Sequence, residues 1–373
     1  MLYITLYPKV WRNTYISENA LMPDYASTTF NINHWEQMKK IKSNFHSNLS
    51  FEDIQSLLPK HFCTFSDERY FSIQIPAYRT DGTEAVIFGF PFKESNIWGI
   101  SMGVVLSNLF SSFNYMAKDV HLVFYRESLK DWLHSYYLEK EIVDIDEQEC
   151  FGGILQAGLV LDIELPKESE QGKAYVKYEG PDGLLPNLDL LNSFFRIASG
   201  HGNIGLSSIS YLLNNDVVGY FKGLFSILFS LGTRAIFHDS EHHGALLKYR
   251  IEAFTLGMMD SDGKNPNIDT RLYDLFPMIE SLWRSVNNIL ERFHQSFFFY
   301  LLPDQLHYIS ISYYMPAVGL FILSQAIMSD ISKHHTYDTL ARFMLIAWIV
   351  TVSSYDFALV YICSPLFYIT LLK

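Results

Sequence analysis

The sequence ILQAGLVLDIEL, residues Ile154–Leu165, decides the fold class, because it is a nearly uninterrupted apolar run of strand length. Two shorter apolar runs precede it, VIFGF at Val86–Phe90 and VHLVFY at Val120–Tyr125. Each of these is followed by a helical pattern, the first over Gly99–Met116 and the second continuing to Tyr137. Apolar strands that alternate with helices predict an α/β fold with a mixed, largely parallel sheet flanked by helices.

Further elements extend this pattern in both directions along the chain. They are a helix at Asn33–Phe45, strands at Ala174–Gly180 and Lys248–Leu256, and helices at Leu188–Ala198 and Tyr273–Gln295. Residues 217–237 are strongly apolar, but the uncharged stretch between their two basic residues is only 11 residues long. Since a membrane-spanning helix needs about 20 apolar residues, we expect a buried core helix there.

The C-terminal part of the chain has the composition of a membrane region. Leu306–Met328 contains no Asp, Glu, Lys or Arg over 23 residues, which is enough to cross a bilayer. A second apolar run, Phe343–Leu372, contains one acidic residue, Asp356. Its cost of about 2.5–3.5 kcal/mol is offset by roughly a dozen large apolar residues. We therefore expect two membrane spans, at about 306–328 and 343–372.

These features divide the chain into three parts. Residues 1–12 are apolar but broken by Pro8 and Lys9, and we interpret them as the possible remnant of an N-terminal signal anchor. Residues 13–303 form the main domain, and 304–373 form the membrane region. The loop between the two expected spans holds Lys333 and Arg342 against Asp330 and Asp338. By the positive-inside rule this is a weak indication of a cytosolic loop, which would place the main domain on the lumenal side.

Composition restricts the partners and the chemistry. The net charge of -12 gives no electrostatic support for a nucleic-acid partner. The three cysteines form no CxxC motif, which argues against a cysteine zinc site. Cys63 and Cys150 would pair in an oxidising compartment, and the alternative is two buried thiols. Asn48 begins a glycosylation sequon that matters only in a lumenal segment.

Few residues suggest catalysis. The chain has no GxSxG, HExxH or GxxxxGK[ST] motif. The cluster HDSEHH, His238–His243, contains metal-ligand types, but its spacing fits no standard site and we expect an exposed loop. Asp162 and Glu164 alternate on one face of a predicted strand, where paired carboxylates could serve acid–base or metal chemistry. The solvated face of a strand is the favoured interpretation.

Five segments, in order along the chain, carry a resemblance to a known family. They are TYISENAL (Thr14–Leu21), LPNLDLLNSF (Leu185–Phe194), LLKYRIEAFTL (Leu246–Leu256), LERFHQSFFFYLLP (Leu290–Pro303) and YMPAVG (Tyr314–Gly319). With them the chain resembles the GPI anchor attachment protein family, the large non-protease subunit of the glycosylphosphatidylinositol (GPI) transamidase complex. Members usually have a complete N-terminal span and more C-terminal spans than this chain shows.

The resemblance implies a lumenal domain like that of zinc-dependent aminopeptidases, followed by transmembrane helices in the endoplasmic reticulum membrane. It implies a non-catalytic subunit without a cofactor, since the cysteine protease of the complex is another subunit. The implied partners are that protease, the other subunits, the GPI lipid and, through the complex, the proprotein substrate. Of the expected zinc ligands only Glu127 and Asp131 stand near a matching place, so we expect a domain that lost its metals.

Several motif residues are candidates for contact with GPI or with other subunits. They are Tyr15, Glu18, Asn19, Asn187, Asp189, Asn192, His294, Gln295, Phe298, Tyr300, Pro303, Tyr314 and Pro316. Packing inside the domain explains each of them equally well. The alternative function is a membrane-anchored metallopeptidase, which would use Asp162, Glu164, Glu127 and the HDSEHH loop.

Overall fold

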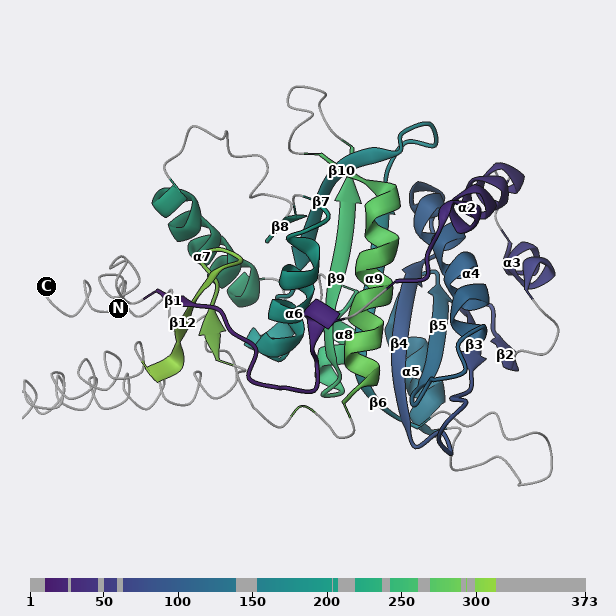
Figure 1. Cartoon of the computed structure of the whole chain (residues 1–373), viewed down its shortest axis with the longest axis horizontal. Helices are drawn as coiled ribbons and strands as arrows, with labels where there is room; N and C mark the ends of the chain where they lie inside the picture. Colours follow the sequence, from purple (N-terminus) through teal and green to yellow (C-terminus); the bar gives the residue numbers. More distant parts are fainter. Residues whose placement is uncertain are drawn as a thin grey trace, which may run out of the picture.

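The structure, a computed structural model, describes most of the main domain (Figure 1). The described residues are 11–25, 28–45, 50–58, 63–138, 153–202, 204–206, 219–236, 242–260, 269–289, 293 and 299–312.

A mixed sheet forms the centre of the domain. Within the described residues it contains nine strands in the order β10-β7-β9-β6-β4-β5-β3-β2, with β8 paired to β7. The strands are β2 (Cys63–Ser66), β3 (Tyr70–Ile75), β4 (Glu84–Pro91), β5 (Asp119–Tyr125), β6 (Ile154–Glu164), β7 (Gln171–Lys177), β8 (Ile204–Gly205), β9 (Glu252–Met259) and β10 (Thr270–Arg271). The four central strands β5, β4, β6 and β9 are parallel, whereas β3, β2, β7 and β10 pair in the antiparallel sense. The predicted mixed sheet is confirmed, although along the described strand path only its central strands are parallel and the outer pairings are antiparallel.

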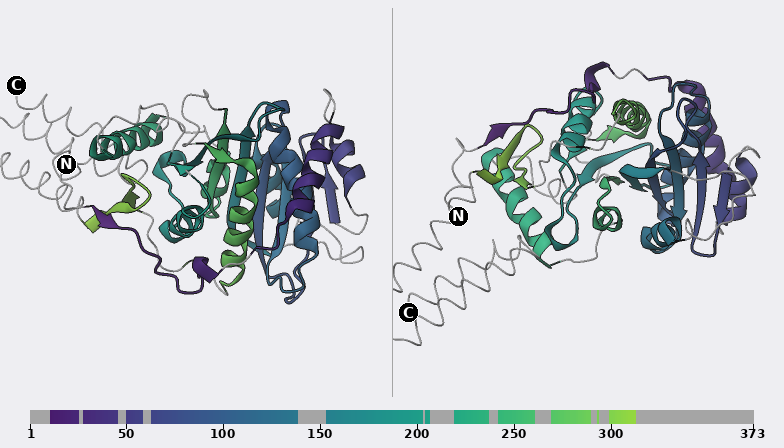
Figure 2. Two further views of the ribbon diagram at one scale, coloured as in Figure 1. Left: turned by 45° about the horizontal axis from the view of Figure 1, so that its top comes forward. Right: turned by 90° about the horizontal axis from the view of Figure 1, so that it is seen from below.

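Helices cover both faces of this sheet (Figure 2). They are α2 (Ile32–Asn44), α3 (Phe51–Leu57), α4 (Ile97–Ser111), α5 (Leu129–Leu138), α6 (Leu188–Ala198), α7 (Gly219–Ile236), α8 (Gly244–Lys248) and α9 (Leu272–Asn287). Helices α4, α6 and α9 pack on one face, with α2 outside α4, and α5 and α8 pack on the other. Neighbouring residues of β4 therefore belong to different hydrophobic cores. Phe88 packs in the core with α4, α6 and α9, and Ile87 packs in the core with α5 and α8.

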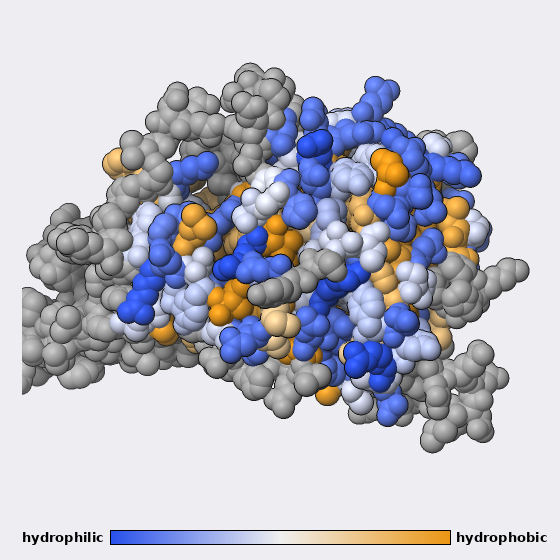
Figure 3. Space-filling view, viewed as in Figure 1, coloured by the Kyte–Doolittle hydropathy of each residue, from blue (hydrophilic) through white to orange (hydrophobic). Residues whose placement is uncertain are grey.

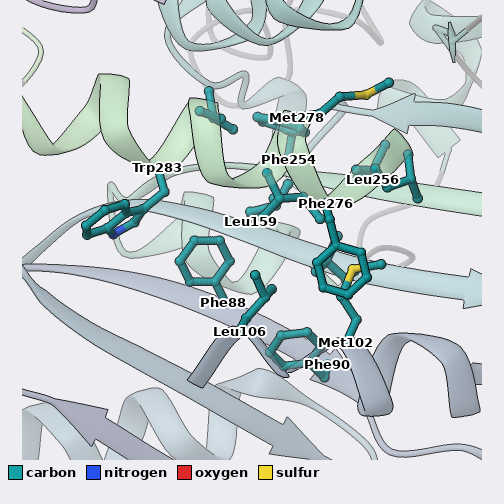
Figure 4. Packing of buried hydrophobic residues seen from close by; sticks show 14 of the residues in the cluster. Phe88, Phe90, Met102, Leu106, Leu159, Phe254, Leu256, Phe276, Met278 and Trp283 are labelled. Atoms are coloured by element: carbon teal, nitrogen blue, oxygen red, sulfur yellow. The ribbon is translucent and has the colours of Figure 1, made fainter. Parts of the chain in front are cut away.

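The larger core lies between the sheet and helices α4 and α9 (Figure 4). Phe88 and Phe90 of β4, Met102 and Leu106 of α4, and Phe276 of α9 all belong to this layer (Figure 4). Gly103 of α4 lets this helix approach closely, because a Cβ there would lie 2.9 Å from the rings of Phe90 and Phe124. The face shown in Figure 3 is mainly hydrophilic, with apolar residues in scattered patches.

A second, small sheet lies away from the main one, beside α7 (Figures 1 and 2). Its order is β1-β12-β11, formed by Arg12–Asn13, His307–Ser310 and Tyr300–Leu301 in antiparallel pairs. The first residues of the run expected to form a span are therefore part of a folded sheet, because β12 finds strand partners on both sides. The rest of that run lies outside the described residues.

Several predicted elements differ from the observed ones in their bounds or in their burial. The helix expected over Tyr273–Gln295 ends at Asn287, and the strand expected from Lys248 begins at Glu252, because Gly244–Lys248 forms α8. The predicted helix over residues 217–237 is confirmed as α7, but its expected burial is wrong, since α7 has large apolar side chains on its surface. No helix in the described parts of the chain has the length and apolar character needed to cross a membrane.

Cys63 is disulfide-bonded, so its interpretation as a free buried thiol is wrong. The other two cysteines, Cys150 and Cys363, lie outside the described residues, as do Asn48, residues 1–10 and the expected second span.

Candidate functional site

Asp189, in the first turn of α6, ties the N-terminal segment to the main domain. Its carboxylate accepts hydrogen bonds from the backbone N–H groups of Ser17, at 3.1 Å, and Glu18, at 3.0 Å, and from the Ser17 hydroxyl at 2.6 Å. The side chain is buried, and the N-terminus of a helix favours a negative charge. Hydrogen bonds to a charged acceptor are stronger than those to a neutral one, so this carboxylate holds the N-terminal segment against α6.

A second buried carboxylate repeats this arrangement in α9. Glu280 accepts hydrogen bonds from the Thr29 N–H and hydroxyl, both at 2.8 Å, and from the Phe30 N–H at 3.0 Å. Arg284, one helical turn further on, donates to the same carboxylate at 2.8 Å. Asp189 of α6 and Glu280 of α9 thus hold the segment between β1 and α2 against these two helices.

Three further hydrogen bonds bring separate motifs together around the start of α6. The Asn187 side chain accepts from the Asp189 N–H at 2.8 Å and caps the helix. The Asn192 amide donates to the Tyr15 carbonyl at 2.8 Å, and the Tyr300 hydroxyl donates to the Pro186 carbonyl at 2.9 Å. Segments far apart in the sequence therefore meet at one place.

Glu252, at the start of β9, adds a fourth motif to this place. Its carboxylate accepts a hydrogen bond from the Asn187 N–H at 2.5 Å. Burial raises the pKa of Glu252 to about 7, and the Asn187 N–H and the charge of Arg250 only partly oppose this. We call Tyr15–Glu18, Pro186–Asn192, Glu252 and Tyr300 the motif junction.

A cavity of about 200 Å³ lies beside the motif junction. It is lined by Leu155, Gln156, Leu184, Leu185, Leu247, Arg250, Ile251, Glu252 and Phe293. The walls are mostly apolar, with one carboxyl, one guanidinium and one amide group. Among the described lining residues, the charged side chains are Arg250 and Glu252.

A second cluster of titratable groups, which we call the carboxyl-end cluster, contains Asp162 near the end of β6 together with His242 and His243. The Asp162 Oδ2 atom is 4.0 Å from His242 Nε2. The other carboxylate oxygen of Asp162 is buried and has no hydrogen-bond partner among the described residues. Burial raises the pKa of Asp162 and lowers that of His242 to about 4, so burial favours the neutral form of each.

His243 is completely buried in this cluster. Its Nε2–H donates to the Glu179 carbonyl at 3.1 Å, because a carbonyl can only accept, and Nδ1 accepts from the Thr255 hydroxyl at 2.8 Å. Burial lowers its pKa to about 3. The expectation of an exposed HDSEHH loop is wrong for His243, and a solvated Asp162 is wrong too, whereas Glu164 is exposed as expected. Residues 238–241 lie outside the described residues.

The residues named for a metallopeptidase do not form a metal site in the described structure. No group of three or more His, Cys, Asp or Glu side chains that could hold a metal occurs among the described residues. Glu127 is exposed, and Asp131 forms an ion pair with Arg69 at 3.0 Å. A protein zinc site needs at least three such ligands.

The candidate contact residues fall into three sets. Asn187, Asp189, Asn192, Tyr300 and Pro303 are buried, and the first four make the internal hydrogen bonds described above. Tyr15, Glu18 and Asn19 are more accessible, with Tyr15 50% exposed. His294, Gln295, Phe298, Tyr314 and Pro316 lie outside the described residues.

Sequence reasoning missed Ser17, Glu252 and Glu280. For Glu280 a signal existed, because it is a single charge within an otherwise apolar stretch of a helix. A charge in such a place is rarely buried unless it is paired.

The described chain is thus a mixed α/β domain whose buried polar residues mainly join distant segments. Its sequence shows its family. The chain belongs to the family described as Gaa1-like, GPI transamidase component, whose family model matches residues 70–361.

Two curated relatives agree with this assignment. The chain is 31% identical over 380 aligned positions to the GPI transamidase component GAA1 of Saccharomyces cerevisiae, which covers 92% of this chain and 58% of that protein. It is 28% identical over 359 positions to the GPI transamidase component gaa1 of Schizosaccharomyces pombe, covering 86% and 59%. The chain therefore spans less than two thirds of the length of these relatives.

Solved structures give only distant matches. The LapA aminopeptidase of Legionella pneumophila is 10% identical with a TM-score of 0.42, over 75% of this chain and 78% of that one. A glutaminyl cyclase of Fimbriiglobus ruber is 12% identical with a TM-score of 0.39, over 73% and 98%.

Proposed function

We propose that this chain is a non-catalytic subunit of the GPI transamidase complex. In this role it helps to bind the GPI lipid and to assemble the complex that attaches GPI anchors to proteins in the endoplasmic reticulum. The observation that carries the proposal is the family match over residues 70–361, together with 31% identity to a GPI transamidase component over 92% of the chain.

The motif junction supports a structural role for most of the shared motifs. Four of the five motif segments are hydrogen-bonded to one another there. Buried hydrogen bonds of this kind specify one arrangement of the domain. Contacts with partner subunits would then be made by the more accessible motif residues, Tyr15 and Asn19.

The disulfide at Cys63 supports a lumenal domain. Disulfides form and persist in oxidising compartments, which include the lumen of the endoplasmic reticulum, and are rare in the cytosol. The expected spans at about 306–328 and 343–372 would attach this domain to the membrane.

The described ligand geometry supports a non-catalytic subunit over a metallopeptidase. Asp162 and His242 approach each other, but no third described ligand completes a metal site. Metal analysis of the purified full chain tests this directly. One zinc ion per chain, with peptidase activity that a chelator removes, would refute the non-catalytic role.

Co-purification tests the role in the complex. The tagged full chain is recovered from detergent-solubilised endoplasmic reticulum membranes and probed for the protease subunit and for bound GPI. The double variant Tyr15→Ala, Asn19→Ala is compared with Tyr78→Ala, whose side chain is 76% exposed but lies outside the motifs. We expect recovery of both partners with the unaltered chain and with Tyr78→Ala, and reduced recovery with the motif variant.

The outcomes separate the two parts of the role. Recovery of the protease without GPI would place assembly in the main domain and lipid binding elsewhere. Recovery of neither, from a chain that remains folded, would show that this chain does not act in the complex.

A further inference from the structure

Helix α7 exposes large apolar side chains on one side. Its Phe221, Phe225 and Leu228 side chains are 58%, 40% and 44% exposed, whereas Ser226, Ile227 and Ser230 are buried. The three exposed positions follow the spacing i, i+4, i+7 and so lie on one side of the helix. We call them the outer stripe. A surface helix in water normally places its apolar side chains toward the core and its polar ones outward.

Packing on the inner side of α7 fixes this orientation. A Cβ atom at Gly223 would lie 2.9 Å from the Trp11 ring and 3.1 Å from the Pro303 carbonyl oxygen, so only glycine allows this close approach. One turn further, Ser226 is buried, and Ser230 lies 3.4 Å from the Tyr178 hydroxyl. Turning the outer stripe inward would force phenylalanine rings into the space that glycine and serine now occupy.

The composition of α7 fits a membrane surface. Its sequence has two basic residues, Lys222 and Arg234, and no acidic residue, in a chain whose net charge is -12. A helix with aromatic residues on one side and basic residues at its ends matches the headgroup region of a bilayer with anionic lipids. The 11 uncharged residues extend only about 17 Å at the helical rise, which is too short for a crossing of about 30 Å.

The position of α7 places it where the chain approaches the membrane region. Gly223 packs on Trp11 and Pro303, which lie next to β1 and β11 of the small sheet. The uncharged run that starts at Leu306 begins in β12 of the same sheet (Figure 2). Leu306 itself is 70% exposed, and Phe299 beside β11 is 56% exposed. Large apolar side chains are therefore exposed on α7 and on the sheet that leads into the run.

We propose that α7 lies in the plane of the membrane surface and that the outer stripe contacts lipid acyl chains. This contact would hold the main domain at a fixed orientation to the bilayer. The inference rests on the membrane attachment in the proposed function and adds a lipid-contacting element outside the expected spans.

Site-specific photo-crosslinking to lipid tests the inference. The full chain is made with p-benzoylphenylalanine in place of Phe225 or, separately, Leu228, and is reconstituted in vesicles of phosphatidylcholine with a minority of phosphatidylserine that carries a traceable label. The matched control replaces Tyr78, an exposed aromatic residue distant in sequence from α7 and the small sheet. We expect lipid adducts at 225 and 228 at a yield about tenfold above that at 78, because an interfacial helix buries its apolar side among lipids.

A separate measurement distinguishes the two ways of failing. Alkaline extraction of the same vesicles shows whether the chain is held in the bilayer. If the chain is extracted, the membrane attachment in the proposed function fails, and this inference fails with it. If the chain is retained but positions 225 and 228 form adducts with protein, or no more lipid adduct than position 78, then only the inference about α7 is wrong.

Discussion

The motif junction and the carboxyl-end cluster both bury titratable side chains, but they treat them differently. In the junction three donors satisfy the carboxylate of Asp189, and Glu252 accepts a backbone N–H. In the cluster one oxygen of Asp162 lacks a partner among the described residues, and His242 is only within 4.0 Å of the other. A buried polar group stabilises the fold only when its hydrogen bonds are made. The hydrogen bonds of Asp189 therefore contribute stability, whereas burying Asp162 and His242 costs it.

The largest effect should come from breaking the junction. Asp189→Asn removes the charge that three donors share and turns an N–H group toward them, so we expect a loss of about 2–4 kcal/mol in the free energy of unfolding. The matched control is Asp24→Asn, which also joins the N-terminal segment to α6, through Arg196 at 2.7 Å. That pair is largely exposed and should contribute at most about 1 kcal/mol.

Denaturant unfolding of both purified full-length variants measures this difference. Equal losses in the free energy of unfolding for Asp24→Asn and Asp189→Asn would show that the burial of Asp189 adds nothing to its contribution.

Acid should weaken the carboxyl-end cluster. The pKa of His242 is lowered to about 4, so the unfolded chain takes up a proton below about pH 6.5 and the folded chain does not. The corresponding stability is present above pH 6.5 and is lost as the pH falls toward 4. His242→Asn should remove this loss. Between pH 7.5 and pH 5, the free energy of unfolding of the variant should therefore fall by roughly 1–2 kcal/mol less than that of the unaltered chain. Identical pH profiles would contradict the assignment of a neutral buried His242.

The junction should respond to pH in the opposite direction. Burial raises the pKa of Glu252 to about 7, so the folded chain retains a proton that the unfolded chain loses above about pH 4.5. The stability from this group is complete below pH 4.5 and is lost as the pH rises to 7. Glu252→Gln should therefore be about 2 kcal/mol more stable than the unaltered chain at pH 6, with little gain at pH 4.5. Glu164→Gln, at an exposed position, is the control, and thermal unfolding at both pH values decides.

The smallest effect is expected at Asp162. Because burial disfavours its charge, Asp162→Asn should leave stability at pH 7 unchanged or increase it by up to about 1 kcal/mol. A clear loss instead would mean that the carboxylate has a charged or hydrogen-bonding partner in solution, which would bring the metallopeptidase alternative back into consideration. Metal analysis of the same preparation would then identify a bound ion.

The local structure of a motif could be predicted from its sequence, but the contacts of its polar residues could not. The motif LPNLDLLNSF predicts a helix with an apolar face, and α6 confirms it over Leu188–Ala198 with Asn187 as its cap. Its polar residues could not be assigned from the sequence, because Asp189 meets Ser17 from a position 172 residues away. No local pattern encodes such a contact, and the same sequence would suit a partner-binding surface.

By itself the sequence determined the elements whose signals are local. Apolar strands alternating with helices fixed the mixed α/β class, since periodicity reports which side of each element is buried. The tertiary structure alone decided where long-range pairing overrides local preference. The sequence after Leu306 enters a strand because β1 and β11 offer it hydrogen-bond partners. Helix α7 turns Phe221 and Phe225 outward because Gly223, on its opposite side, packs directly on Trp11 and Pro303 beside the small sheet.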